Sequence, residues 1–140
     1  MGADEVVGRD FRMQIKTPVD YIANFSEVDE HWAAISELIA PQGGILLIVG
    51  NKAPLNVDAV RAKSAMICFE LMFTRSRFQT ADMIEQHKLL NQVADWLDSG
   101  KLKGTLKETL TPINAANIRK AHQMLEAGTM IGKLVLKGWQ

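Results

Sequence analysis

Cysteine is nearly absent from this sequence, and neither sign of charge is in excess. The single Cys68 excludes an internal disulfide and any metal site built from cysteine alone. Sixteen Lys and Arg residues balance sixteen Asp and Glu residues, so no net field attracts nucleic acid or an anionic membrane. No basic run interrupts this balance. We therefore expect no nucleic-acid partner.

Long apolar runs are also missing. The longest, Ile45 to Val49, has the length of a buried strand, whereas a transmembrane helix needs roughly 20 apolar residues. The first ten residues are acidic and contain no apolar segment of the kind found in signal peptides. These features predict a cytoplasmic protein with no membrane partner.

Signature motifs of catalysis are absent as well. The sequence has no glycine-rich dinucleotide turn, no P-loop, no H-E-x-x-H and no G-x-S-x-G. The three histidines, His31, His87 and His122, are far apart and fall within expected helices, which favours structural or solvent-facing roles. Because no histidines and carboxylates are spaced to converge on an ion, the sequence predicts no metal site.

The sequence does contain short apolar runs that alternate with amphipathic segments. This alternation is typical of an α/β domain, and 140 residues suffice for one domain with a hydrophobic core. The first four expected strands fit one parallel sheet, whereas the last two do not and are assigned to another domain. The expected strands are Asp4–Val7, Val19–Phe25, Ile45–Val49, Ser64–Leu71, Thr105–Thr111 and Ile131–Leu136.

The helix between the second and third strands has signals at both ends. Ser26 is the expected N-cap, with Asp29 three residues later in the manner of a capping box. Pro41 and the pair Gly43-Gly44 are expected to end it before the next strand begins.

Two later helices are also delimited by their caps. Thr80 is the expected cap of the longest helix, Ala81–Asp98, which Gly100 closes. Asn114 caps the last helix, and Gly128 ends it.

The strand Ser64–Leu71 carries an implication for assembly. If it is the last strand of the sheet, its free edge carries Met66, Phe69 and Leu71 and few charges. Such an edge tends to pair with another copy, which predicts a homodimer by strand addition. Two arginines follow this strand, Arg75 and Arg77. They could contact a phosphate or a stacked base, or they could lie on an amphipathic surface whose aromatic residues point inward.

Polar residues and glycines follow the second and third expected strands. In the simpler interpretation, Gly50 and Asn51 are turn residues. In open α/β sheets, however, ligands bind beyond the carboxyl ends of the strands. On that basis Asn24, Phe25, Gly50 and Asn51 face one crevice.

Several segments together resemble a known family. These are the opening GADEVV, VDYIANF at the second expected strand, Phe69 to Leu97, and the ending A-H-x-x-L-E-x-G-x-x-x-G-K-L-V-L over Ala121 to Leu136. They are similar to the C-terminal portion of the medium-chain dehydrogenase/reductase superfamily. The branch they resemble holds the zinc-type alcohol dehydrogenases and quinone oxidoreductase-like proteins.

The resemblance implies both a fold and a cofactor site. Residues 1–98 are expected to form the C-terminal half of a Rossmann-type parallel sheet, and residues 99–140 to return to a GroES-like catalytic domain that is mostly absent from this sequence. Residues that line the coenzyme in the family correspond here to Asn24 and Phe25 after the fourth family strand, Val49, Gly50 and Asn51 after the fifth, Phe73 and Thr74 after the sixth, and Lys133.

The implied function is oxidoreductase chemistry, in which a hydride passes between NADP or NAD and a carbonyl, quinone or enone. The glycine-rich turn that holds the pyrophosphate in the family is absent, so we expect the 140 residues to be a fragment that binds cofactor weakly or not at all and is inactive alone. No zinc ligand of the family falls on this sequence. The alternative is a non-catalytic, dimeric folded module. The substrate and the choice between NADP and NAD stay open.

Overall fold

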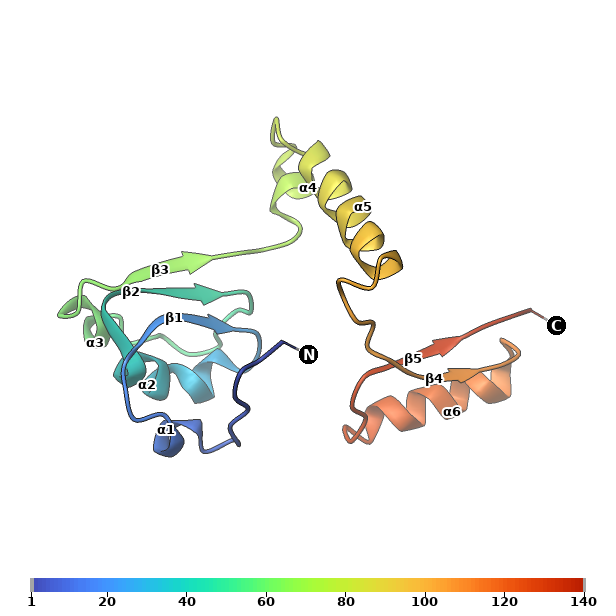
Figure 1. Cartoon of the computed structure of the whole chain (residues 1–140), viewed down its shortest axis with the longest axis horizontal. Helices are drawn as coiled ribbons and strands as arrows, with labels where there is room; N and C mark the ends of the chain where they lie inside the picture. Colours follow the sequence, from blue (N-terminus) through green and yellow to red (C-terminus); the bar gives the residue numbers. More distant parts are fainter. Residues whose placement is uncertain (1, 140) are drawn as a thin grey trace. The chain divides into compact units, whose positions relative to one another are not determined.

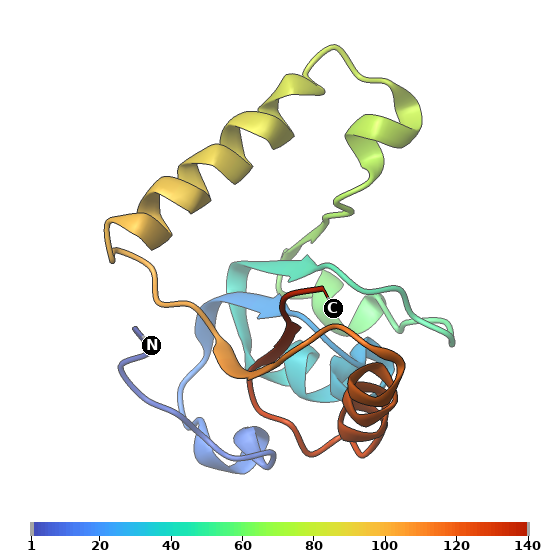
Figure 2. The same ribbon diagram turned by 90° about the vertical axis from the view of Figure 1, so that its right-hand side faces the viewer.

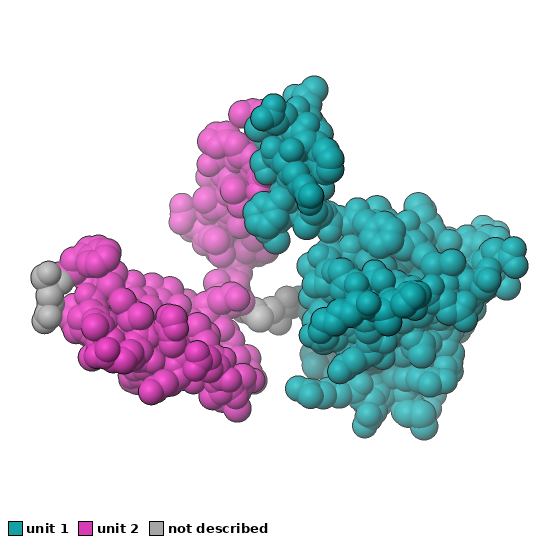
Figure 3. All heavy atoms as spheres, turned by 180° about the vertical axis from the view of Figure 1, so that it is seen from behind, with its two compact units in different colours: residues 1–83 teal, residues 84–140 magenta. Residues whose placement is uncertain are grey.

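A computed structural model describes residues 2–139, which divide into two compact units between Met83 and Ile84. Figure 3 colours these units separately, and each is described here by itself. Both contain parallel strands with helices, so the expected α/β class is confirmed. The boundary between these compact units is a different matter from the expected change of domain after Asp98. That domain boundary stays a prediction.

The first unit is built on a three-stranded parallel sheet in the order β1-β2-β3. β1 spans Val19–Asn24, β2 Ile39–Leu47 and β3 Met66–Phe69 (Figure 1). Ile22 of β1 lies opposite Ile45 of β2, and the strands run in the same direction. The expected parallel pairing of these two strands is confirmed.

Helix α2, Val28–Leu38, packs on one face of this sheet (Figure 1). Its apolar residues recur at helical spacing, as the sequence predicts, and they meet the side chains that alternate strand residues direct to that face. Trp32 also donates a 3.1 Å hydrogen bond from Nε1 to the carbonyl oxygen of Asn56. The buried core consists of Val28, Trp32, Ile35, Ile39, Ile45, Leu47 and Val60. Burial of each large apolar side chain contributes about 1.5–3 kcal/mol.

The expected capping box at the start of α2 is wrong. The helix begins at Val28, with Glu27 at the N-cap in a left-handed conformation (φ 38°) and no side-chain cap. Asp29 is not available to complete a box, because its two carboxylate oxygens accept hydrogen bonds from the backbone of Lys52 and Ala53.

The expected end of α2 and start of β2 are also wrong. Pro41, Gly43 and Gly44 lie within β2 and do not separate it from the helix. A Cβ atom at Gly43 would lie 2.8 Å from the carbonyl oxygen of Asp20, so the absent side chain permits close approach of the neighbouring strand. The glycine therefore marks an irregular parallel pairing and not a helix stop.

The C-terminus of α2 is closed by a lysine. The ammonium group of Lys63 donates to the carbonyl oxygens of Ser36 (2.9 Å), Glu37 (2.7 Å) and Ile39 (2.8 Å). A cation at this end satisfies carbonyls that have no partner inside the helix and opposes the negative end of the helix dipole.

Three short helices complete the first unit, namely α1 at Phe11–Gln14, α3 at Asp58–Arg61 and α4 at Thr74–Phe78. The expected strand Asp4–Val7 is wrong: no strand forms there, and Val6 is 88% exposed. An isolated strand has no ladder partner, and none of the described strands pairs with this segment.

The second unit begins with α5, Ile84–Asp98, which starts later than expected. Thr80 does not cap it, since its hydroxyl bonds to Asp82. Gly100 has a positive φ of 73°, consistent with its expected role after the helix. None of the residues of α5 is buried.

The rest of the second unit follows the sequence closely. β4, Leu106–Leu110, and β5, Lys133–Leu136, form their own two-stranded parallel sheet, separate from β1-β2-β3 as expected. The chain between these strands forms α6, Ala115–Glu126, which lies alongside the strand pair (Figure 1 and Figure 2). Asn114 caps α6 by accepting a 2.9 Å hydrogen bond from the backbone of Asn117, and Gly128 follows the helix with φ 65°. Both expected caps are confirmed.

Candidate functional site

The carboxyl ends of the three strands of the first unit meet at one edge. Asn24 lies opposite Leu47, and Leu47 lies opposite Phe69. Backbone hydrogen bonds continue past the strands, from Ile48 N to Asn24 O (3.4 Å) and from Glu70 N to Leu47 O (3.0 Å). The segments that follow β1, β2 and β3 therefore leave the sheet together, as ligand binding at this edge requires.

Asn24 stands out among the predicted site residues. Only 7% of its surface is exposed, and within residues 2–139 its Oδ1 atom has no hydrogen-bond partner. A buried acceptor without a partner costs about 1–3 kcal/mol, so this atom is a candidate acceptor for a ligand or for an ordered water. Asn24 and Phe25 are among the residues that line a cavity of about 330 Å³, together with Phe11, Ile22, Ser26, His31 and Ile35.

The loop after β2 is held by the first turn of α2. Asp29 accepts 2.9 Å hydrogen bonds from the backbone N–H groups of Lys52 and Ala53. These two bonds lower the pKa of Asp29 below its ordinary value of 3.8. Asn51 donates from Nδ2 to the carbonyl oxygen of Ala53 at 2.8 Å. These three hydrogen bonds hold the loop in a defined conformation.

The predicted residues of this loop differ in what they can offer. Around Gly50 a Cβ atom would meet nothing within 4 Å, so the backbone there is open to a close approach. Val49 is half-buried and packs against the hydrophobic core, which gives it a structural role. Phe25 is 67% exposed beside Asn24.

The remaining predicted residues lie farther along the chain. Phe73, 60% exposed, precedes α4, and Thr74 is the first residue of that helix. Thr74 lines a hollow of about 310 Å³ with Phe69, Glu70, Leu71, Arg75, Thr80 and Asp82. Lys133 opens β5 in the second unit, so its approach to the strand ends stays a prediction.

Arg75 is engaged within the chain. Its Nε lies 2.9 Å from Oδ2 of Asp82. Hydrogen bonds from Thr80 and Arg75 lower the pKa of Asp82. The arginine therefore already has a carboxylate partner, which favours the surface interpretation over a phosphate contact.

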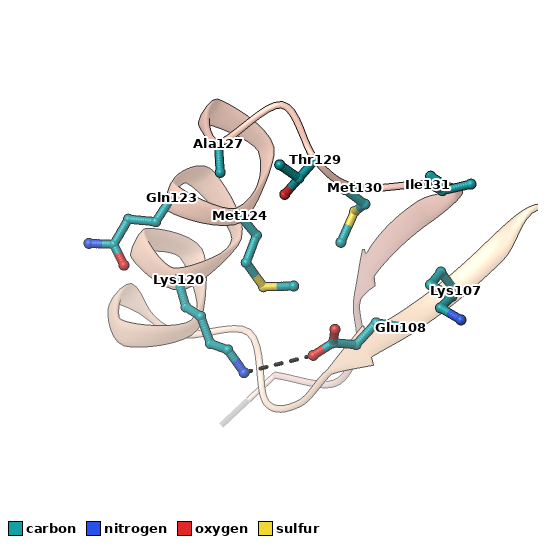
Figure 4. A pocket seen from close by; sticks show the side chains of 9 residues that line it. All are labelled: Lys107, Glu108, Lys120, Gln123, Met124, Ala127, Thr129, Met130 and Ile131. Atoms are coloured by element: carbon teal, nitrogen blue, oxygen red, sulfur yellow. Dashed lines mark ion pairs between the residues drawn. The ribbon is translucent and has the colours of Figure 1, made fainter. Parts of the chain in front are cut away.

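A larger hollow lies in the second unit, and no sequence motif predicts it. It has a volume of about 810 Å³ and lies between α6, β4 and the segment before β5 (Figure 4). Lys120 Nζ is 3.7 Å from Glu108 Oε1 at its side, and both side chains are half exposed. The other lining residues are Lys107, Gln123, Met124, Ala127, Thr129, Met130 and Ile131. Such an open groove with one exposed ion pair provides no recognisable catalytic group.

Within residues 2–139 no group of three or more His, Cys, Asp or Glu side chains is arranged to hold a metal ion. Likewise, no helix in the described part of the chain is long and apolar enough to cross a membrane.

Comparison with known proteins decides the family. The profile of the family described as zinc-binding dehydrogenase matches residues 1–136. This chain belongs to the zinc-binding dehydrogenase family. The resemblance to zinc-type alcohol dehydrogenases that the sequence motifs predict is thereby confirmed.

Curated zinc-binding dehydrogenase relatives share moderate identity over nearly the whole chain. The zinc-type alcohol dehydrogenase-like protein SAS2087 of Staphylococcus aureus is 34% identical over 142 residues, and its counterpart in Staphylococcus epidermidis is 30% identical over the same length. In both, the alignment covers 97% of this chain and 42% of the relative. The chain thus spans about two fifths of the length of these relatives.

Solved structures of two similar proteins can be superimposed on this chain. A Rhizobium etli protein described as a zinc-dependent alcohol dehydrogenase is 42% identical with a TM-score of 0.76, covering 88% of this chain and 36% of that one. The quinone oxidoreductase of Coxiella burnetii is 21% identical with a TM-score of 0.66, covering 99% of this chain and 40% of that one. The second likeness supports the fold alone.

Proposed function

We propose that these 140 residues supply one side of an NAD(P)H site in an oxidoreductase that passes a hydride between nicotinamide and a carbonyl, quinone or enone. Membership of the zinc-binding dehydrogenase family supports the reaction class. The observation that carries the proposal is the buried Oδ1 atom of Asn24, which lies at the edge where the parallel strands end and has no hydrogen-bond partner among residues 2–139.

The residues at this edge fit part of a dinucleotide. Asn24 offers a desolvated acceptor to an N–H or O–H group, and the backbone at Gly50 leaves room for a ribose or phosphate to approach. Asp29 contributes indirectly, because it holds the backbone of the loop that carries Gly50 and Asn51. The cofactor, when bound, supplies the hydride chemistry, while the chain binds and orients it.

Pyrophosphate binding is the part these residues do not provide. In dinucleotide folds a glycine-rich turn before a helix presents backbone N–H groups to the phosphates, and the 140 residues have no such motif. We therefore expect the chain by itself to bind NADPH in the millimolar range at best, near −4 kcal/mol, and to show no reductase turnover. We assign the pyrophosphate contacts to the part of the relatives that the alignment leaves unmatched.

Calorimetric titration with NADPH and NADH tests this proposal. The samples are the 140-residue chain and a chimaera in which the chain replaces the matching segment of the Rhizobium etli protein, with that protein itself as the positive control. We expect binding of one cofactor by the chimaera and little heat from the chain alone. A chimaera that folds with the same circular dichroism as the control but binds neither cofactor contradicts the proposal.

A second candidate is a non-catalytic module that dimerises through β3, and a specific observation favours the dimer. β3 is an edge strand, and large apolar side chains on and beside it are exposed, namely Met66 (64%), Phe69 (72%) and Leu71 (47%). Edge strands of this kind pair with copies of themselves unless they are covered. Pairing of two β3 strands would extend both sheets without altering the Asn24 edge, so the dimer is compatible with either function.

A further inference from the structure

The segment that leaves β3 and carries Phe73 and Thr74 has little packing to hold it. Met72 and Phe73 are 62% and 60% exposed, and the five residues of α4, the helix that follows, are all exposed or half-buried. A helix this short is marginal by itself, because most helical stability in proteins comes from burial of an apolar face. The conformation of this segment therefore depends on polar contacts.

One carboxylate joins α4 to the turn that follows it. Asp82 accepts a 2.9 Å hydrogen bond from Nε of Arg75 at one oxygen and a hydrogen bond from the hydroxyl of Thr80 at the other. The backbone N–H of Thr80 also donates to the carbonyl oxygen of Arg75 at 3.1 Å. These three bonds close the turn after α4 and leave both oxygens of Asp82 engaged.

The contact of Asp82 with α4 lies directly beside two residues that the sequence assigns to the cofactor. Thr74 is the first residue of α4, and Phe73 is its N-cap. On the other side, the backbone N–H of Glu70 donates a 3.0 Å hydrogen bond to the carbonyl oxygen of Leu47, at the edge where the strands end. Phe73 and Thr74 therefore lie between two anchored points.

We propose that Asp82 is a positioning residue for the cofactor, which acts by fixing α4 through Arg75 and Thr80 so that Phe73 and Thr74 keep one arrangement at the strand-end edge. The inference rests on the proposed function, because it takes NAD(P)H as the ligand of that edge. Asp82 acts through its neighbours and does not itself contact the cofactor. A segment that is ordered before binding loses less conformational freedom on binding, and this raises affinity.

Asp82→Asn in the chimaera with the Rhizobium etli protein tests the inference by calorimetry. The amide keeps the size of the side chain and an oxygen for Thr80, but its NH₂ group cannot accept from Arg75. We expect the Kd for NAD(P)H to rise about three- to tenfold. Arg75→Met should have the same effect, and the double variant no larger one, because all three lose a single shared contact.

A conservative variant and a second measurement separate positioning from general destabilisation. Asp82→Glu keeps the charge within reach of Arg75 and should bind cofactor more tightly than Asp82→Asn does. In the 140-residue chain without cofactor, hydrogen exchange at the backbone amides of Arg77 and Thr80 should be about three- to tenfold faster in Asp82→Asn. These amides donate to the carbonyl oxygens of Phe73 and Arg75, so they report the order of α4 directly.

Asp58→Asn is the matched control. Asp58 lies 2.9 Å from Nε of Arg61 in the same unit, and both side chains are exposed, but this ion pair connects residues of α3 only. Its loss should leave the Kd for NAD(P)H and the exchange of the α4 amides unchanged.

Three outcomes overturn the inference while the proposed function stands, provided that the unaltered chimaera binds cofactor. The first is equal affinity in the unaltered chimaera and Asp82→Asn. The second is equal weakening by Asp82→Asn and Asp58→Asn, which would indicate general destabilisation. The third is equal exchange of the α4 amides with and without the carboxylate. A folded, unaltered chimaera that binds neither cofactor overturns the proposed function and this inference with it.

Discussion

The carboxylate of Asp29 accepts a 2.9 Å hydrogen bond from the backbone N–H of Ala53, which joins the first turn of α2 to the loop that follows β2. Its other oxygen accepts an equal bond from Lys52. One side chain therefore holds the loop containing Gly50 and Asn51, the residues that the sequence assigns to cofactor binding. This contact links the stability of the first unit to the geometry of the candidate site.

Asp29→Asn should destabilise the chain at neutral pH and lose its effect in acid. The hydrogen bonds from Lys52 and Ala53 lower the pKa of Asp29 below 3.8, so the folded state binds this proton less readily than the unfolded state. The stabilisation is fully present above pH 3.8 and is lost as the pH falls through the folded pKa. Thermal unfolding of both proteins against pH measures this, with Glu30→Gln as the matched control. A gap between the two unfolding temperatures that stays constant down to pH 2 (about two units below the ordinary pKa) would refute the role of Asp29.

Lys63→Met should lower the free energy of unfolding by about 1–3 kcal/mol, because it leaves carbonyl oxygens at the end of α2 without their charged donor. The methionine keeps the length of the apolar stem, so lost packing contributes little. Urea denaturation followed by circular dichroism gives the value. Lys52→Met, at an exposed lysine of the same unit, is the control and should change stability by less than about 0.5 kcal/mol.

Asn114→Ala should destabilise the second unit by about 1 kcal/mol through loss of the N-cap of α6. Asn114→Ser should restore most of the stability, since a serine hydroxyl can accept the same bond from Asn117. Hydrogen exchange of the first-turn amides of α6 reports the effect locally. Equal protection in the alanine and serine variants would show that the cap contributes nothing.

Phe69→Lys should convert a dimer built on β3 into monomers. The side chain is 72% exposed on the edge strand, so a lysine there is tolerated by the fold and opposes pairing with a second copy. Sedimentation velocity of both proteins measures the change, and Val57→Lys is the control. The same mass for Phe69→Lys and the unaltered chain would place any self-association elsewhere.

Local signals in the sequence predicted the second unit better than the first. Asn114 and Gly128 act on their immediate neighbours, so their roles can be derived from the sequence around them. Gly43 acts through another strand: a Cβ atom there would collide with the carbonyl oxygen of Asp20, more than twenty positions away. A pattern that normally ends a helix therefore lies inside β2, and nothing local distinguishes the two cases.

The candidate site could likewise be predicted from the sequence only in part. The placement of Asn24 beside β2 follows from parallel strand order, which the apolar runs predict. Other features of the site depend on contacts between segments about twenty residues apart. Val49 packs into the core, and Asp29 holds the loop after β2 and so leaves the start of α2 without a cap. The groove beside Lys120 arises from the packing of α6 against β4 and has no sequence motif at all.

Asn24→Leu provides the most direct test that the strand-end edge holds the cofactor. In the folded chain it removes a buried acceptor that has no partner within residues 2–139, so stability should be unchanged or rise by about 1 kcal/mol. In the chimaera with the Rhizobium etli protein, calorimetry should record NAD(P)H binding weakened by roughly 5- to 100-fold, the equivalent of one lost hydrogen bond in a desolvated site. Asn91→Leu, on the exposed surface of α5, should leave binding unchanged. Unaltered affinity in the Asn24→Leu chimaera would contradict the account.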